Sequence, residues 1–125
     1  MTITKQSAKQ KGRKLVQTVK EMLLSTFSIL QNDDILCASG STPGEDIQLS
    51  PLARGLFPFS VECKNQQNLS IWAALKQCQT NAGKHIPLLI FKRNHSTIYA
   101  AMPFNELLSI LVLLKKTTDA NNISG

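Results

Sequence analysis

The chain of 125 residues is long enough for one modest hydrophobic core, which argues against a multidomain architecture. Hydrophobic residues make up 42% of it, near the globular norm, and the net charge of +6 favours a polyanionic partner. Three widely spaced cysteines without a CxxC pair argue against a disulfide framework and a zinc site, and the longest apolar run, 110–114, is too short to span a bilayer.

The N-terminal segment is basic, and no acid precedes Glu21. We expect residues 1–10 to form a basic arm that leads into a helix, with phosphate contact as its use. The candidates for phosphate contact here are Lys9, Lys11, Arg13 and Lys14. A solubilising or disordered terminus is the alternative for residues 1–10.

The first helix is predicted from about Lys11 to Leu30. Its apolar residues recur at helical spacing: Leu15, Val19, Met22 or Leu23, Thr26 or Phe27, and Leu30. The neighbouring polar side of this helix carries Gln17, Lys20 and Glu21. A polar run over 32–34 ends the helix, and residues 35–38 are typical of a short strand.

A segment rich in glycine and serine, 39–45, precedes Asp46. It is not a phosphate-binding P-loop, because no Gly-Lys-Ser/Thr sequence closes it. Residues 48–56 are expected to form a loop or a single turn, since Pro51 and the lack of alternation argue against a strand. Arg54 in this segment either contacts phosphate or is a solvated loop charge.

The central strand is predicted over 59–65, where apolar and polar residues alternate. Because successive side chains point to opposite faces, Glu62 and Lys64 share one face. Asp46 lies 16 positions before Glu62, a separation that a hairpin with a long loop would close. Two carboxylates can bind Mg²⁺, while a lysine orients the attacking water and offsets charge on a phosphate. The alternative interpretation is a solvated, charge-paired outer face of the sheet.

A second helix is predicted from about Ser70 to Ala82. Its helical spacing places Trp72 in the buried face, although a tryptophan could also stack on a nucleic-acid base. Two strands joined as a hairpin and a last helix follow: 87–92, 97–101 and 104–115.

The last helix carries an apolar stretch, 107–114, which is either a contact surface between two copies or a face buried in the core. Residues 117–125 are expected to form a flexible tail. The predicted order is helix, three strands, helix, two strands, helix, an α/β fold with a mixed sheet flanked by helices in a single domain over 11–116.

With these elements in place, the chain resembles the PD-(D/E)xK nuclease superfamily. The resemblance rests on two motifs, Gly44-Glu45-Asp46-Ile47 and Glu62-Cys63-Lys64, with a basic helix before them and a glutamine-bearing helix after them. Over about residues 11–101 the chain is similar to archaeal-type Holliday junction resolvases and their small phage-encoded relatives. This resemblance implies a restriction-endonuclease-like core.

The resemblance also implies roles for individual residues. Asp46 and Glu62 would be metal ligands, with the backbone carbonyl of Cys63 as a third. Lys64 takes the position of the catalytic lysine. Gln77 matches a glutamine that is often near the site in this superfamily, and a surface helix glutamine is the alternative.

Two positions depart from the family pattern. Gln17 stands where the resolvases carry a glutamate on the first helix, and Glu21, one turn further on, is the alternative source of charge. Glu45 precedes Asp46 where the family has proline, and it is therefore a rival acid. Ser41 matches a loop serine of the resolvases and is a candidate DNA contact.

The residues and the resemblance together predict a Mg²⁺-dependent endonuclease, with Mn²⁺ able to substitute and no organic cofactor. Its expected substrate is branched DNA, above all the four-way junctions of DNA recombination, cut by a homodimer without contact to membranes. The alternatives are another nuclease of the superfamily, of nicking or restriction type, and a DNA-binding module without catalysis. No apolar segment follows the charged N-terminus promptly, so we expect a cytoplasmic protein, in the host cytoplasm if a phage encodes it.

Overall fold

The structure, a computed structural model, describes residues 5–38 and 44–123. Ser41, the predicted DNA contact in the loop, lies outside the described residues. The elements in chain order are α1 (Lys5–Thr26), the 3₁₀ turn η1 (Asn32–Asp34), β1 (Ile35–Cys37), β2 (Ile47–Leu49), α2 (Pro51–Leu56), β3 (Phe59–Asn65), α3 (Ile71–Ala82), β4 (Ile86–Lys92), β5 (Tyr99–Ala101) and α4 (Phe104–Ile123).

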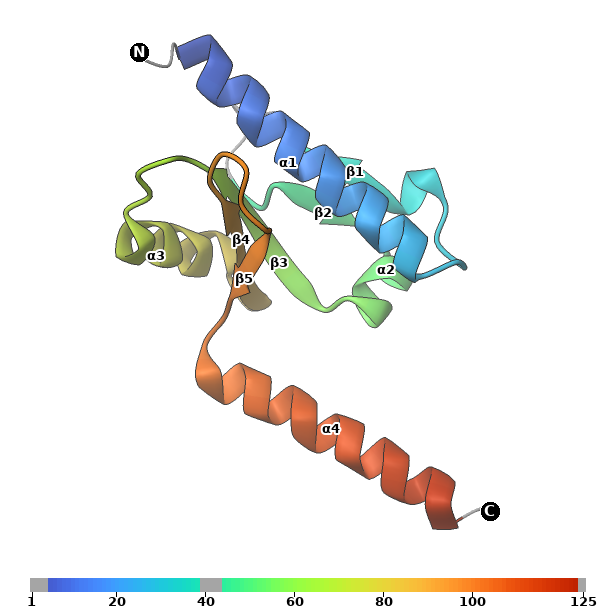
Figure 1. Cartoon of the computed structure of the whole chain (residues 1–125). Helices are drawn as coiled ribbons and strands as arrows, with labels where there is room; N and C mark the ends of the chain where they lie inside the picture. Colours follow the sequence, from blue (N-terminus) through green and yellow to red (C-terminus); the bar gives the residue numbers. More distant parts are fainter. Residues whose placement is uncertain (1–4, 39–43, 124–125) are drawn as a thin grey trace.

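Two small sheets form the centre of the molecule (Figure 1). Strands β1 and β2 make an antiparallel pair, while β3, β4 and β5 form a second sheet in that order. Strand β4 runs parallel to β3 and antiparallel to β5. Helix α3 makes the crossover that a parallel pair of strands requires. The prediction of a mixed α/β fold is confirmed.

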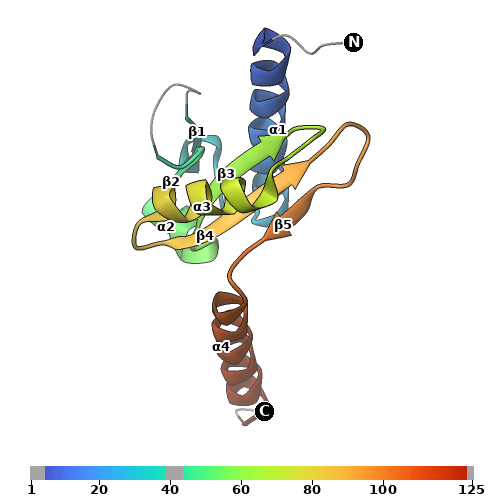
Figure 2. The same cartoon turned by 90° about the vertical axis from the view of Figure 1, so that its left-hand side faces the viewer.

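Helices cover both faces of the three-stranded sheet (Figure 2). On one face, the core joins α1 residues such as Leu15 to Val61 and Cys63 of β3. On the other face, α3 packs Ala74 and Cys78 against Leu89, whose side chain is fully buried. Glu62 alternates with Val61 and Cys63 and therefore faces the α3 side of the sheet.

Helix α1 begins earlier and ends earlier than predicted. It starts at Lys5, so residues 5–10 of the predicted arm are helical, and it ends at Thr26. Lysine, glutamine and alanine favour helix in this segment, and Gly12 is tolerated within it. Lys20, which was expected on the polar side, is only 8% exposed, because the buried stripe of α1 is wider than the spacing predicted.

Helix α2 occupies most of the segment that was expected to be a loop or a single turn. Ser50 begins it, because its Oγ accepts a hydrogen bond of 3.1 Å from the backbone nitrogen of Ala53. Pro51 suits the first helical position, where no backbone N–H is needed. The Ser50 hydroxyl also donates to Oδ1 of Asp34 at 2.7 Å, which joins α2 to η1.

Trp72 does not lie in the buried face of α3, which corrects the prediction. Its side chain is 80% exposed, whereas Ala74 and Cys78 are buried. The buried stripe of α3 is narrow, and Trp72 lies beside it on the solvent side. Helical spacing alone did not determine which apolar positions of this helix face the sheet.

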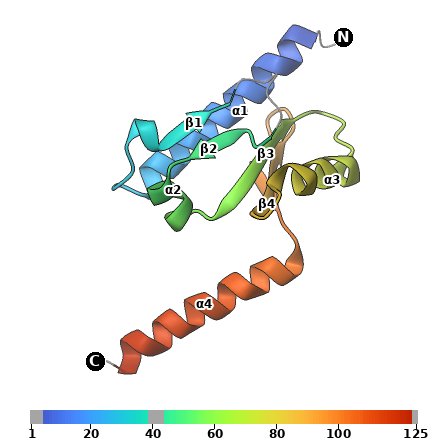
Figure 3. The same ribbon diagram turned by 180° about the vertical axis from the view of Figure 1, so that it is seen from behind.

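Helix α4 projects from the rest of the molecule (Figures 1 and 3). It continues to Ile123, so residues 117–123, expected in a flexible tail, are helical. No glycine or proline interrupts this stretch, and the Lys115 Nζ lies 3.3 Å from Oδ2 of Asp119 one turn on. Its large apolar side chains remain exposed, among them Leu111 at 48% and Leu113 at 63%.

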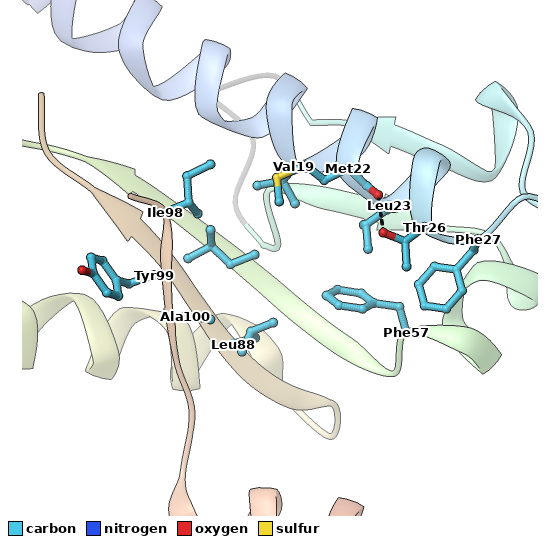
Figure 4. A pocket seen from close by; sticks show the side chains of 11 residues that line it. Val19, Met22, Leu23, Thr26, Phe27, Phe57, Leu88, Ile98, Tyr99 and Ala100 are labelled. Atoms are coloured by element: carbon cyan, nitrogen blue, oxygen red, sulfur yellow. Dashed lines mark hydrogen bonds between the residues drawn. The ribbon is translucent and has the colours of Figure 1, made fainter. Parts of the chain in front are cut away.

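An apolar groove of about 400 Å³ lies between the C-terminal half of α1 and the strands β4 and β5 (Figure 4). Val19 and Leu23 of α1, with Phe27 directly after the helix, form one wall. Leu88 of β4 and Ile98 form the opposite wall. The molecule therefore presents two separate apolar surfaces, this groove and the α4 helix.

Candidate active site

Asp46 lies where the β1–β2 hairpin meets the edge of β3. Its backbone nitrogen donates to the carbonyl of Val61 at 2.9 Å, and its Oδ2 accepts from the backbone nitrogen of Cys63 at 2.7 Å. Its own carbonyl accepts from the backbone nitrogen of Ala38 at 2.9 Å. Backbone bonds on both sides of Asp46 thus fix its carboxylate against β3.

Glu62 lies beneath α3 and is only 4% exposed. The Lys64 Nζ is 3.6 Å from its Oε1, as expected for two side chains on one face of a strand. Its other oxygen, Oε2, accepts a hydrogen bond of 3.3 Å from Nδ2 of Asn81 on α3. Both carboxylate oxygens therefore have a partner, and the group is oriented from two directions.

The two carboxyl groups interact electrostatically. Burial raises the pKa of Asp46, against the opposing effects of the Cys63 N–H and the Lys64 charge. Burial also raises the pKa of Glu62, and the nearby Asp46 charge raises it further. The site thus holds two partly desolvated acids and one amine, an arrangement in which a bound divalent cation would favour the charged carboxylates.

Cys63 contributes its main chain and not its thiol. Its side chain is buried in the core on the α1 side, and burial raises the pKa of the thiol well above its usual range. Its N–H points to Asp46, so its carbonyl points to the same edge of β3. That orientation agrees with the predicted use of the Cys63 carbonyl as a ligand.

Asn81 is a site residue that the sequence did not reveal. It lies one turn after Gln77 on α3, and a scan of the polar residues along this helix would have included both. Gln77 itself is exposed, and its side chain makes no hydrogen bond with another described residue. The residue on α3 that reaches the acids is Asn81 and not Gln77.

Gln17 and Glu21 lie together on the exposed side of α1. Gln17 Nε2 is 3.4 Å from Oε1 of Glu21, and Gln17 Oε1 is 3.8 Å from the Sγ of Cys37. Cys37 pairs with Ile47, the residue after Asp46. Gln17 therefore lies at the rim of the site, without a direct contact to Asp46 or Glu62 among the described atoms.

Glu45, the rival acid, forms an ion pair with Arg54. The guanidinium binds both carboxylate oxygens of Glu45, at 2.7 and 3.3 Å. It also donates to the carbonyl of Phe59 at 2.8 Å. Arg54, predicted as a phosphate contact, thus makes its hydrogen bonds inside the protein and fixes the loop before Asp46.

The basic residues predicted to contact DNA differ in their surroundings. Lys9, Arg13 and Lys14 are exposed on α1. Lys11 instead donates from Nζ to Oδ1 of Asn94 at 2.8 Å and joins α1 to the turn between β4 and β5. The basic residues of α1 that are available to contact a phosphate are therefore Lys9, Arg13 and Lys14.

The donor set suits a hard divalent cation with few protein ligands. In the part of the chain that the structure describes, no three His, Cys, Asp or Glu side chains form a group that could hold a metal ion. Two carboxylates with a backbone carbonyl and water ligands would match Mg²⁺, which usually keeps several waters.

Comparison with family models, curated proteins and solved structures finds no match to this chain. Among the described helices, none is both long and apolar enough to cross a membrane. Fold and site together define an α/β protein with a paired-acid and lysine site at a sheet edge.

Proposed function

We propose that this chain is a Mg²⁺-dependent endonuclease of the PD-(D/E)xK type, with a restriction-endonuclease-like core, that cuts branched DNA. The observation that carries the proposal is the position of Asp46, Glu62 and Lys64. Asp46, directly before β2, accepts a hydrogen bond from β3, which carries the acid-x-lysine pair, and both acids are partly desolvated. A structural ion pair would not require a second carboxyl beside the first.

Each residue of the site has a distinct task in this proposal. Asp46 and Glu62 hold the cation, and Asn81 keeps Glu62 oriented. Mg²⁺, when bound, polarises a phosphate oxygen and lowers the pKa of a water molecule. Lys64 orients that water and offsets the negative charge that develops on the phosphate. Mn²⁺ fits the same oxygen ligands.

A homodimer is part of the proposal. One chain supplies one set of catalytic residues, whereas a four-way junction is resolved by a cut in each of two strands. A two-fold dimer places two identical sites at a fixed separation. Exposed apolar residues of α4 and the apolar groove beside α1 are surfaces that such a dimer would bury.

A DNA-binding role without catalysis explains the two carboxylates of the site less well than a nuclease does. Carboxylates beside a polyanion weaken binding unless a cation neutralises them. Another nuclease of the superfamily, of nicking or restriction type, would use the same residues. Substrate preference alone separates that function from junction resolution.

The test is a cleavage assay of the purified chain on a four-way junction, a flap and a linear duplex of equal length. We expect Mg²⁺-dependent and Mn²⁺-dependent cleavage that is fastest on the junction, and no cleavage with EDTA. Cleavage of all three substrates at one rate would replace the resolvase with a general nuclease. Absence of cleavage with either metal would overturn the proposed function.

A further inference from the structure

A second pocket, of about 450 Å³, lies on the α3 side of the sheet, beside the end of β3. Its volume lies within the range of about 300–1,000 Å³ that is usual for small-ligand sites. Aromatic, basic and amide residues line it, among them Phe91, Tyr99, Lys92, Arg93, Gln66 and Gln67. No carboxylate is among the described lining residues.

The strand register places this pocket next to the candidate active site. Lys64 pairs with Phe91 across β3 and β4, and Phe91 pairs with Tyr99 across β4 and β5. Register partners point to the same face, so the three side chains form a row on the face that also carries Glu62. Neighbouring strands lie about 4.8 Å apart, which puts Tyr99 about 10 Å from Lys64. Successive stacked nucleotides advance about 3.4 Å, so this row spans a few nucleotides of one DNA strand.

The aromatic pair offers a surface on which a base can stack. The ring centroids of Phe91 and Tyr99 are 6.0 Å apart, with a tilt of 31° between the planes. Tyr99 is 57% exposed, and its hydroxyl makes no hydrogen bond with another described residue. An exposed ring of this kind binds bases of any sequence by stacking.

Polar groups around the rings suit the rest of a nucleotide. Arg93, in the exposed turn two residues after Phe91, brings positive charge to this strand end. Lys92 instead pairs with Asn65 on the α1 face of the sheet. Gln67 accepts a hydrogen bond of 3.2 Å from the backbone nitrogen of Asn94, which fixes one wall of the pocket. The exposed side-chain amide of Gln66 can hydrogen-bond to the edge of a base, since an amide both donates and accepts hydrogen bonds.

We propose that this pocket binds an unpaired nucleobase of the strand that is being cut, stacked on Tyr99 and Phe91, with Arg93 on the adjoining phosphate. The inference rests on the proposed function, because it takes DNA as the substrate. Bases in a paired duplex are stacked on each other and do not reach the pocket, whereas bases at a branch or fork do. The pocket would therefore supply the preference for branched DNA, which the acids and Lys64 cannot supply.

The test compares binding of two labelled oligonucleotides in EDTA, a fork with unpaired thymines and a full duplex of the same length. Fluorescence anisotropy gives the dissociation constants, and the single tryptophan, Trp72, next to the lining residue Ile71, provides a second signal. We expect Tyr99→Leu to weaken binding to the fork at least about ten-fold and binding to the duplex less than two-fold, because a leucine removes stacking and keeps apolar volume. Tyr99→Phe should bind the fork like the wild type.

Phe104→Leu is the matched control, since Phe104 is another exposed aromatic, lies on α4 and is not among the residues that line the pocket. If Tyr99→Leu loses the same affinity for the fork and for the duplex, or keeps its affinity for the fork, the pocket does not bind an unpaired base. If Tyr99→Leu fails to fold, it loses both affinities and its circular dichroism signal. In that case Arg93→Gln, in the exposed turn, tests the proposal, since it should weaken binding to the fork more than binding to the duplex. Failure of the proposed function has a different signature: no cleavage by the wild type with Mg²⁺, even where the fork preference depends on Tyr99.

Discussion

At the scale of single residues, the site depends on two acids that the fold keeps partly out of water. The alternation around Glu62 and Lys64 predicted their shared face, since side-chain direction in a strand follows from position alone. The contact between Asn81 and Glu62 was not predictable, because it joins residues 19 apart across a crossover. The pairing of Arg54 with Glu45 likewise depends on how α2 folds back on the loop.

We expect Asp46→Asn and Lys64→Ala to lower the cleavage rate at least about 10²-fold. Binding of DNA should stay within about three-fold of wild type, since the basic residues of α1 are intact. Gel assays with Mg²⁺ measure cleavage, and anisotropy with EDTA measures binding. Lys116→Ala, an exposed lysine on α4, is the control and should cut normally. Wild-type rates in either site variant would show that the catalytic residues lie elsewhere.

The pH dependence of stability tests the burial of Glu62. Its pKa is raised in the folded protein, so the folded state holds the proton more tightly than the unfolded chain does. In the metal-free protein, the contribution of Glu62 to the free energy of unfolding therefore falls as the pH rises from 4.5, its pKa in the unfolded chain, through its raised pKa in the folded protein.

Glu62→Gln removes this titration, and we expect a higher melting temperature than wild type at pH 7 in EDTA. The difference should shrink as the pH falls below 4.5, where the wild-type carboxyl is protonated. Scanning calorimetry between pH 4 and pH 8 measures both. A lower melting temperature for Glu62→Gln at pH 7 would mean that the contacts with Lys64 and Asn81 outweigh the cost of burial.

At the scale of elements, strands with clear alternation were predicted well and helix ends were not. The sequence predicted the helix between β3 and β4 but not the parallel pairing of these strands, which the structure shows. The extra turns of α1 consist mostly of good helix formers, whereas those of α4 contain threonine, aspartate and asparagine, whose helix propensity is low, so propensity argued for an earlier end of α4. The exposure of Trp72 could not be predicted, because it depends on the width of the contact between α3 and the sheet.

Helix α1 should contribute strongly to the salt dependence of DNA binding. Neutralising one phosphate adds about 0.9 to the slope of log affinity against log salt on duplex DNA. We expect the triple variant Lys9→Ala, Arg13→Ala, Lys14→Ala to reduce this slope by about 2 to 3. Titrations between 50 and 300 mM NaCl measure it, with Lys115→Ala, Lys116→Ala on α4 as the control. An unchanged slope would assign the DNA contact to another surface.

At the scale of the whole molecule, the described part of the chain exposes large apolar side chains on α4 and in the groove beside α1. The sequence left open whether 107–114 was a contact surface or a buried face, since periodicity cannot show what covers a helix. In the structure this stretch is not buried within its own chain.

We expect a homodimer of twice the 13.8 kDa chain mass in sedimentation experiments. Leu111→Glu, which places a charge on the exposed apolar face of α4, should shift the protein to monomer and abolish paired nicks on a junction. Thr118→Glu, further along α4, should remain dimeric. A wild-type chain that sediments as a monomer at all concentrations would rule out this dimer.

The attachment of the β1–β2 hairpin through Asp46 has a consequence for local motion. Both hydrogen bonds between this hairpin and β3 in the described part of the chain involve Asp46. Because so few hydrogen bonds join the hairpin to β3, we expect it to open at a lower free energy than global unfolding requires, although opening also exposes the buried Ile35 and Ile47. Each opening would take one of the two acids away from the other. Hydrogen exchange should then show faster exchange of the β1 and β2 amides than of those in β3 and β4, and catalytic competence should fade on heating before the central sheet melts.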